Sequence, residues 1–144
     1  MLELNFDGYY KPDAVQSSRQ GLYIAWLGKI INNKFHIEKL LYIGMTTRPL
    51  SDRVREHLIE DHLGWRISMK DLTGDKDILY SICELSGNFT EDNLRDLEAE
   101  LVYANKPCMN ELLKDAYTRT TYYDILCHGL PSFMKREIHL EDLR

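Results

Sequence analysis

Two polar side chains near the middle of the chain have the spacing of a functional pair. Arg53 and His57 are four residues apart, and the apolar residues Leu50, Val54 and Leu58 recur at the same interval. This period is typical of a helix, so we expect the pair to lie together along one helix edge. The planar guanidinium of an arginine suits a phosphate better than a lysine would, and the imidazole could contact the same phosphate or a leaving group.

A carboxylate also falls among apolar residues. On a helical wheel of Thr90–Ala104, Glu98 lies between Leu94 and Val102, whereas Glu100 lies on the polar face. A buried carboxylate is costly unless it is paired with a cation or binds a metal ion. Periodicity therefore singles out Glu98, either as a metal ligand or as half of a buried ion pair with an arginine.

Four landmarks follow one another along the chain: the tripeptides Gly21-Leu22-Tyr23 and Tyr42-Ile43-Gly44, the pair Arg53 and His57, and Glu98 with Asn110 after it. In this order and spacing the chain resembles the GIY-YIG nuclease family, with Leu22 replacing the usual isoleucine. The resemblance covers the chain from about Gly21 to Asn110. Either tripeptide alone would be a weak signal, but four ordered landmarks are specific.

The resemblance implies an endonuclease that hydrolyses phosphodiester bonds in DNA with the help of Mg²⁺ or Mn²⁺. It assigns the phosphate to Arg53, and it makes Glu98 the single protein ligand of the metal ion beside water molecules. Tyr23 would be the general base or would position the attacking water, and Tyr42 would be its orienting hydrogen-bond partner. A tyrosine with a pKa of about 10 is a poor base at neutral pH, so a cation or metal must favour the phenolate.

The other residues of the expected site have supporting roles. His57 would contact the leaving group or the phosphate. Asn110 would lock the loop after the glutamate-bearing helix, or position a backbone near the metal ion. Gly21 and Gly44 flank the two tyrosines and support the site.

The elements that position these residues predict an α/β (α+β) domain, with a small central antiparallel sheet of about three strands flanked by helices. The expected strands are Gly21–Leu27, Leu40–Gly44 and Ile78–Leu85, and the expected helices are Leu50–Leu63 and Thr90–Ala104. The first two strands form an antiparallel hairpin in the simplest arrangement. We expect the two helices to lie around one face of this sheet, so that Tyr23, Tyr42, Arg53 and Glu98 converge there. Thr90 is a suitable cap for the second helix.

We divide the chain into three parts. Residues 1–20 form an N-terminal extension that we expect to be irregular, with a brief strand at Leu2–Phe6, because Asp7-Gly8 and Lys11-Pro12 are typical of turns. Residues 21–110 form the nuclease-like core. Residues 111–144 form a C-terminal elaboration packed on the same domain, with a short helix at Glu111–Tyr117 and a strand at Thr120–Cys127.

The charge balance limits how the chain could hold DNA. Eighteen Lys and Arg face twenty-three Asp and Glu, a formal net charge of −5. This charge opposes the binding of a long duplex by phosphate neutralisation alone. We therefore expect contacts with duplex or branched DNA to rest on a few local cations around Arg48, Arg53, Arg55 and Arg66, on a metal ion, or on a protein partner or second subunit that supplies specificity.

Other features concern the environment of the protein. No apolar run approaches the length of a membrane span, and the N-terminus has no basic region followed by an apolar one, so we expect an intracellular, cytoplasmic protein without a membrane partner. Three widely spaced cysteines, Cys83, Cys108 and Cys127, show no zinc-like pairing, and we interpret them as core thiols. Two alternatives to the nuclease stay open: a nucleic-acid-binding or regulatory module without turnover, and a nuclease subunit of a larger complex.

Overall fold

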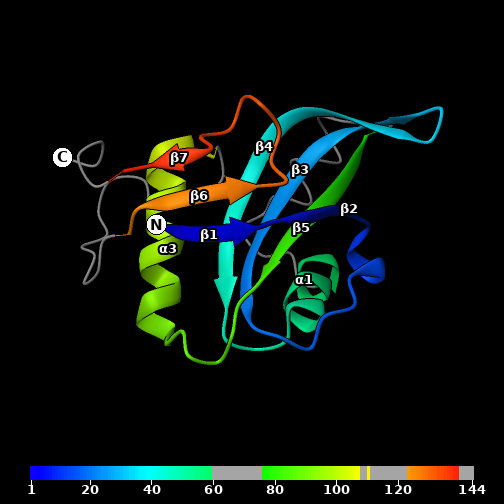
Figure 1. Ribbon diagram of the computed structural model, residues 1–144. Helices are drawn as coiled ribbons and strands as arrows, with labels where there is room; N and C mark the ends of the chain where they lie inside the picture. The colour runs from blue at the N-terminus through cyan, green and yellow to red at the C-terminus, as the bar shows by residue number, and fades with distance from the viewer. Residues whose placement is uncertain (60–75, 108–109, 111–122, 140–144) are drawn as a thin grey trace.

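The computed structural model describes residues 1–59, 76–107, 110 and 123–139, with only the backbone for residues 57–59. The described residues form an α+β structure of two sheets and two α-helices (Figure 1). The larger sheet has four strands in the order β2-β5-β3-β4, and every neighbouring pair is antiparallel. Its strands are β2 (Asp7–Tyr10), β3 (Gly21–Ile31), β4 (Lys34–Thr46) and β5 (Asp77–Glu84).

Strands β3 and β4 form the expected antiparallel hairpin, but both strands are longer than predicted. The turn is made by Asn32 and Asn33, whose φ angles of 51° and 61° are left-handed conformations that asparagine tolerates. The register places Tyr23 opposite Gly44 and Ala25 opposite Tyr42. Because residues directly opposite one another share a face of the sheet, both tyrosines lie on the same face.

The N-terminal segment is more regular than predicted. The brief strand is present as β1 (Leu2–Asn5), but the expected turn at Asp7-Gly8 lies in a second strand, β2, which pairs with β5 at the sheet edge. The larger sheet therefore has four strands rather than three. The register of β2 shifts between Asp7 and Tyr10, and such an irregular edge strand lacks the alternating pattern that would have revealed it.

A second sheet joins the two ends of the described chain. β1 pairs in parallel with β6 (Ile125–His128), and β6 pairs with β7 (Glu137–Ile138). Of the strand predicted over Thr120–Cys127, residues 120–122 lie outside the described residues and β6 begins at Ile125; the helix predicted over Glu111–Tyr117 also lies outside the described residues. A short 3₁₀ helix, η1 (Pro12–Ala14), follows β2.

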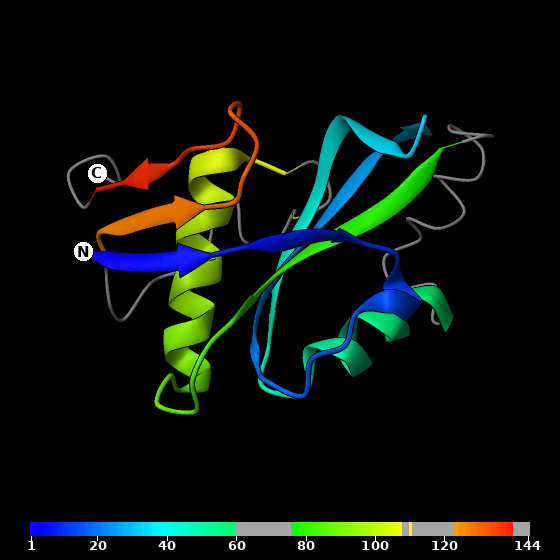
Figure 2. The same ribbon diagram turned by 45° about the vertical axis from the view of Figure 1, so that its right-hand side comes forward.

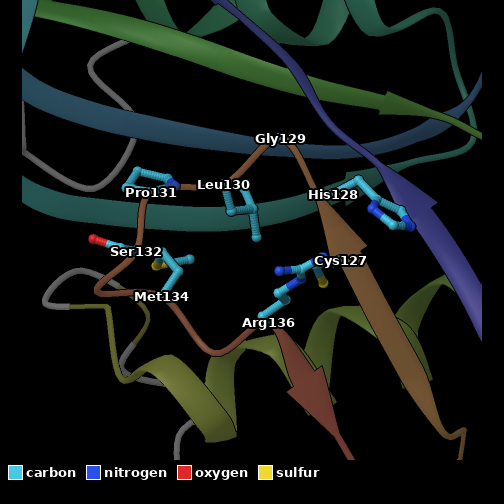
Figure 3. A pocket seen from close by; sticks show the side chains of 8 residues that line it. All are labelled: Cys127, His128, Gly129, Leu130, Pro131, Ser132, Met134 and Arg136. Carbon is cyan, nitrogen blue, oxygen red and sulfur yellow. The ribbon is translucent and has the colours of Figure 1, made fainter.

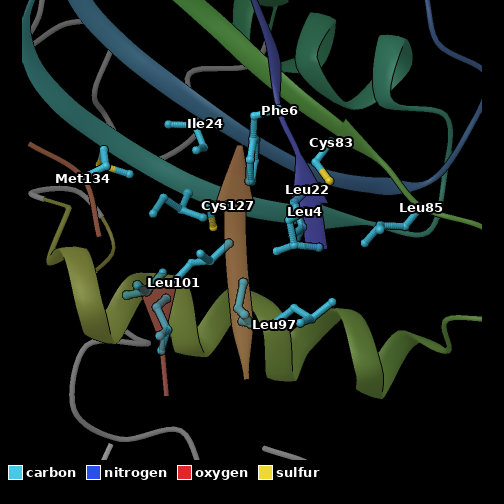
Figure 4. Close-up of a cluster of buried hydrophobic side chains, with 14 of the residues drawn as sticks. Leu4, Phe6, Leu22, Ile24, Cys83, Leu85, Leu97, Leu101, Cys127 and Met134 are labelled. Carbon is cyan, nitrogen blue, oxygen red and sulfur yellow. The ribbon is translucent and has the colours of Figure 1, made fainter. Parts of the chain in front are cut away.

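The two α-helices pack against opposite faces of the larger sheet (Figures 1 and 2). Tyr23, Ala25 and Leu27 of β3 pack with α1 (Leu50–Ile59), whereas the alternating residues of the same strand pack with α3 (Glu91–Asn105). The core that lies between α3 and the larger sheet also contains residues from β1 and β6, and Figure 4 shows side chains of α3 beside them. Within the described chain, neither α-helix is long and apolar enough to cross a membrane.

Helix α3 begins and ends with well-defined caps. The Thr90 hydroxyl accepts a hydrogen bond from the backbone N–H of Asn93 at 3.1 Å, and the Asn93 side chain accepts one from the backbone N–H of Thr90 at 3.0 Å. Lys106 closes the helix in a left-handed conformation, just before Pro107. The predicted start of this helix at Thr90 is confirmed, and these caps fix the position of Glu98 along it.

Candidate functional site

Tyr23 and Tyr42 lie side by side on the face of the sheet that α1 covers. Their ring centroids are 6.0 Å apart, and their hydroxyl groups are hydrogen-bonded. Tyr23 is fully buried and Tyr42 is half-buried. A Cβ on Gly44 would lie 2.5 Å from the Tyr23 hydroxyl oxygen, so only glycine leaves room for the Tyr23 ring at this position.

Arg53 joins this pair from the first half of α1. Its guanidinium donates a hydrogen bond to the Tyr23 hydroxyl, and its positive charge lowers the pKa of both tyrosines. Burial opposes this effect and prevails, so the pKa of Tyr23 lies well above its ordinary value and that of Tyr42 is raised as well. Both tyrosines are therefore protonated at neutral pH in the metal-free protein.

Glu98 reaches the same place from the opposite face of the sheet. We expected the two helices to flank one sheet face, and this expectation is wrong because the alternating residues of β3 separate them. The Glu98 carboxylate accepts a hydrogen bond from the backbone N–H of Met45 in the edge strand β4. The positive charge of Arg53 lowers the pKa of Glu98, and the negative charge of Glu98 raises the pKa of Tyr23 and of Tyr42.

The environment of Glu98 favours its protonated form. The side chain is 6% exposed, and burial raises its pKa to about 8, although Arg95, the Met45 N–H and Arg53 each lower it. No described lysine or arginine forms an ion pair with this carboxylate. The buried ion pair that was the alternative for Glu98 is therefore not found among the described residues.

Glu98 is not the only buried carboxylate of α3. Asp96 and Glu100 are fully buried too, so the prediction that Glu100 lies on a polar face is wrong. The Glu100 side chain accepts a hydrogen bond from the backbone N–H of Tyr123 at 2.7 Å, which shows that the chain near Tyr123 covers this side of the helix. What distinguishes Glu98 is its contact with the edge of β4 beside Tyr42 and Arg53.

Asn110 and Gly21 hold the surrounding backbone. The Asn110 side chain forms hydrogen bonds with both polar groups of the Ile43 backbone, between Tyr42 and Gly44, and so fixes Asn110 to the edge of β4. A Cβ on Gly21 would overlap the carbonyl oxygen of Cys83 in β5. Glycine at this position allows β3 and β5 to approach closely beside Tyr23.

The remaining predicted residues are His57 and the arginines at positions 48, 55 and 66. His57 lies in the last part of α1, but its side chain is outside the described residues, as is Arg66. Arg55 is exposed and donates to the backbone oxygen of Val15 at 3.3 Å, away from Arg53. Arg48 lies on the turn before α1 and shares an ionic partner with Arg53.

This partner, Glu56, was missed by the sequence analysis. It forms ion pairs with Arg48 and Arg53, and these guanidiniums lower its pKa to about 2. Its position three residues after Arg53 on a helix was the available signal, because residues at that interval are neighbours on the helix surface. Thr46, the last residue of β4, is buried and accepts a hydrogen bond from the backbone N–H of Arg48.

The side chains of the candidate site can be compared with the ligands that the expected metal ion prefers. Among the described residues, no three His, Cys, Asp or Glu side chains gather to hold one. A single buried carboxylate without an ion pair fits Mg²⁺ or Mn²⁺, because these hard cations bind oxygen and magnesium keeps several of its waters. Glu98 is the residue that would hold it.

A cavity of about 420 Å³ lies elsewhere, between the end of β6 and the start of β7 (Figure 3). Its lining includes His128, Leu130, Met134 and Arg136, and none of the predicted site residues. The candidate site is instead the cluster at the edge of β4. Comparisons with models of protein families, with curated proteins and with solved structures give no match to this chain.

Proposed function

We propose that the protein is a metal-dependent endonuclease that hydrolyses phosphodiester bonds in DNA. The observation that supports this proposal is the convergence of Tyr23, Tyr42, Arg53 and Glu98 at one edge of the larger sheet. These four residues come from two strands and two helices, and they are the ones that the resemblance to the GIY-YIG nuclease family implies. Their chemistry suits phosphoryl transfer, which relies on positioning and charge stabilisation.

Arg53 would bind the scissile phosphate. It is already oriented by its hydrogen bond to Tyr23, and the planar guanidinium has remaining N–H donors for phosphate oxygens. The raised pKa of Tyr23 favours one of its two expected roles. Tyr23 would position the attacking water through a hydrogen bond, and Tyr42 would orient the Tyr23 hydroxyl. A base role for Tyr23 would require a further positive charge close by.

Glu98 would hold Mg²⁺ or Mn²⁺, an ion that supplies Lewis-acid stabilisation and lowers the pKa of bound water. Because the pKa of Glu98 is about 8 without metal, binding near neutral pH would displace a proton from this carboxylate. A bound cation would replace this proton and would stabilise the buried negative charge of the carboxylate. Metal affinity should therefore rise with pH up to about 8.

The contact with DNA would be local. Arg48 and Arg53 are the predicted cations that adjoin the site in the described chain, and the net charge of −5 gives no general attraction for a duplex. We propose that a protein partner or a second copy of the chain supplies further contacts and specificity. A module that binds nucleic acid without turnover is the competing function.

The test is a cleavage assay on duplex, branched and single-stranded DNA, with and without Mg²⁺. Defined products from the wild type in Mg²⁺, and none from Glu98→Gln, would support the endonuclease. Binding without any product in Mg²⁺ or Mn²⁺ would instead support the non-catalytic module. Cleavage of matched RNA but not of DNA would show that the proposed substrate is wrong.

A further inference from the structure

Two arginines beside the candidate site share one carboxylate. Nη2 of Arg48 and Nη1 of Arg53 donate to the same oxygen of Glu56, Oε2, at 2.8 and 3.0 Å. Nη1 of Arg48 also lies 2.5 Å from Oε1 of Glu56. These contacts join the turn before α1 to the surface of that helix.

The two arginines differ in depth. The Arg53 side chain is 23% exposed and hydrogen-bonded to Tyr23, whereas the Arg48 side chain is 57% exposed. The backbone of Arg48 is fixed by the buried Thr46, whose hydroxyl accepts from its N–H at 3.0 Å. The two arginines therefore extend from the buried tyrosines to the exposed surface beside the site.

Glu56 makes this arrangement electrostatically possible. Two guanidiniums this close repel each other, and the carboxylate between them offsets the repulsion while leaving one net positive charge. An arginine has five N–H donors, so each guanidinium keeps donors that Glu56 does not use. Glu56 already bridges the two guanidiniums, in the place where a single phosphate would otherwise bridge them. Two phosphates, one on each arginine, would leave the carboxylate in place.

We propose that Glu56 is a positioning residue that holds Arg48 and Arg53 as a clamp for two consecutive phosphates of one strand. Arg53 would bind the scissile phosphate and Arg48 its neighbour. The inference rests on the proposed nuclease function and narrows its substrate class. The preferred substrate is an internal phosphodiester of a polynucleotide strand, rather than a mononucleotide or a terminal phosphate.

A simpler view would make Glu56 a shield that weakens the binding of DNA by its negative charge. The two views predict opposite signs for Glu56→Gln. A shield predicts tighter binding and unchanged or faster turnover, whereas the clamp predicts weaker binding and slower turnover despite the lost negative charge. Asp52→Asn is the matched control, because Asp52 is an exposed carboxylate of α1 whose charge acts on Arg48 without a hydrogen bond to it.

The first measurement is the binding of a labelled DNA oligonucleotide in chelator, as a function of salt. For Arg48→Gln we expect the slope of log affinity against log salt to fall by about 0.7 to 0.9, the effect of one lost phosphate contact. For Glu56→Gln we expect binding weaker than that of the wild type, and for Asp52→Asn no weakening. A wild-type slope for Arg48→Gln, or tighter binding by Glu56→Gln, would overturn the clamp.

The second measurement is steady-state cleavage in Mg²⁺. We expect Arg48→Gln to raise KM with little change in kcat, and Glu56→Gln to lower kcat by about tenfold, the effect of about 1.4 kcal/mol of lost transition-state stabilisation. Turnover by Glu56→Gln at the wild-type rate, or an equal loss in Asp52→Asn, would contradict the positioning role. If the wild type cleaves nothing, the proposed nuclease fails, whereas the binding measurement still decides the clamp.

Discussion

The side chain of Asn110 pairs with the backbone of Ile43 as a neighbouring strand would. Its Oδ1 accepts from the Ile43 N–H at 2.8 Å, and its Nδ2 donates to the Ile43 carbonyl oxygen at 2.6 Å. Asn110 is buried, so these two bonds satisfy the edge of β4 where water has little access. The Met45 N–H, two residues further along β4, is bonded to Glu98. The edge of β4 is thus bonded both to Asn110, which holds its backbone, and to Glu98 of α3, the proposed metal ligand.

Replacing Asn110 should destabilise the protein and disturb the site. Asn110→Ala leaves the buried N–H and C=O of Ile43 without their partner, at about 1–3 kcal/mol for each group left unpaired. We expect this loss in the free energy of unfolding, measured with denaturant. Asn110→Asp is the control, because the ionised side chain keeps an acceptor for the Ile43 N–H but has no donor for the carbonyl. An alanine variant as stable as the wild type would show that water replaces both bonds.

Adding a methyl group at Gly44 should displace Tyr23. The new Cβ of Gly44→Ala would lie 2.5 Å from the Tyr23 hydroxyl oxygen, and such overpacking typically costs about 1–3 kcal/mol. We expect lower stability together with a loss of cleavage. Gly87→Ala is the matched control, because nothing lies within 4 Å of a Cβ added there, and both its stability and its activity should match those of the wild type. Full activity in Gly44→Ala would contradict the role of Tyr23.

Glu98→Gln should separate activity from stability. The variant keeps the shape of the side chain but cannot take a buried negative charge, so we expect it to lose cleavage in Mg²⁺ while folding at least as stably as the wild type in chelator. Thermal unfolding and cleavage are measured on the same preparations. A variant destabilised by about 3–5 kcal/mol that still cleaves DNA would show that Glu98 belongs to a buried ion pair.

The stability of the metal-free wild type should fall as the pH rises. The pKa of Glu98 is about 8 in the folded protein and near 4.5 when unfolded, so the folded state holds an extra proton between these values. Relative to Glu98→Gln, the wild type has its full stability below pH 4.5 and loses about 4–5 kcal/mol of it as the pH rises through 8. Unfolding of both proteins across this range measures it, and parallel curves would contradict it.

The affinity for DNA should depend only weakly on salt. Arg48 and Arg53 offer a small number of phosphate contacts beside the site, and the chain as a whole is acidic. Binding measured in chelator should therefore show a shallow slope against log salt. A slope like that of proteins with about six or more phosphate contacts would indicate a wider binding surface, either from residues not described in the structure or from an oligomer.

Local signals in the sequence were sufficient for the central hairpin and for the start of α3. Apolar runs bounded by glycine mark β3 and β4, and Thr90 marks the cap. The ordered motifs also selected the residues that the structure brings together, although α1 and α3 pack on opposite faces. This separation follows from the packing of whole helices against alternate residues of β3, which no local pattern reports.

Features that depend on distant segments were not predictable. β2 lacks an alternating pattern because it is an irregular edge strand. It is a strand only because it pairs with β5, which is distant in the sequence. Glu100 was placed on a polar face by the helical wheel, but the wheel does not include the chain near Tyr123 that covers it. The ionic role of Glu56 depends on Arg48, which belongs to the preceding turn.

The parallel pairing of β1 with β6 sets an order of events during synthesis. Leu2 pairs with Ile125, so β1 has no partner until nearly the whole described chain has left the ribosome. The pairing of β3 with β4, which carries Tyr23 and Tyr42, is local in the sequence and can form early, whereas the pairing of β1 with β6 joins distant segments and is slow. In a nascent chain the core between α3 and the second sheet therefore stays exposed longest.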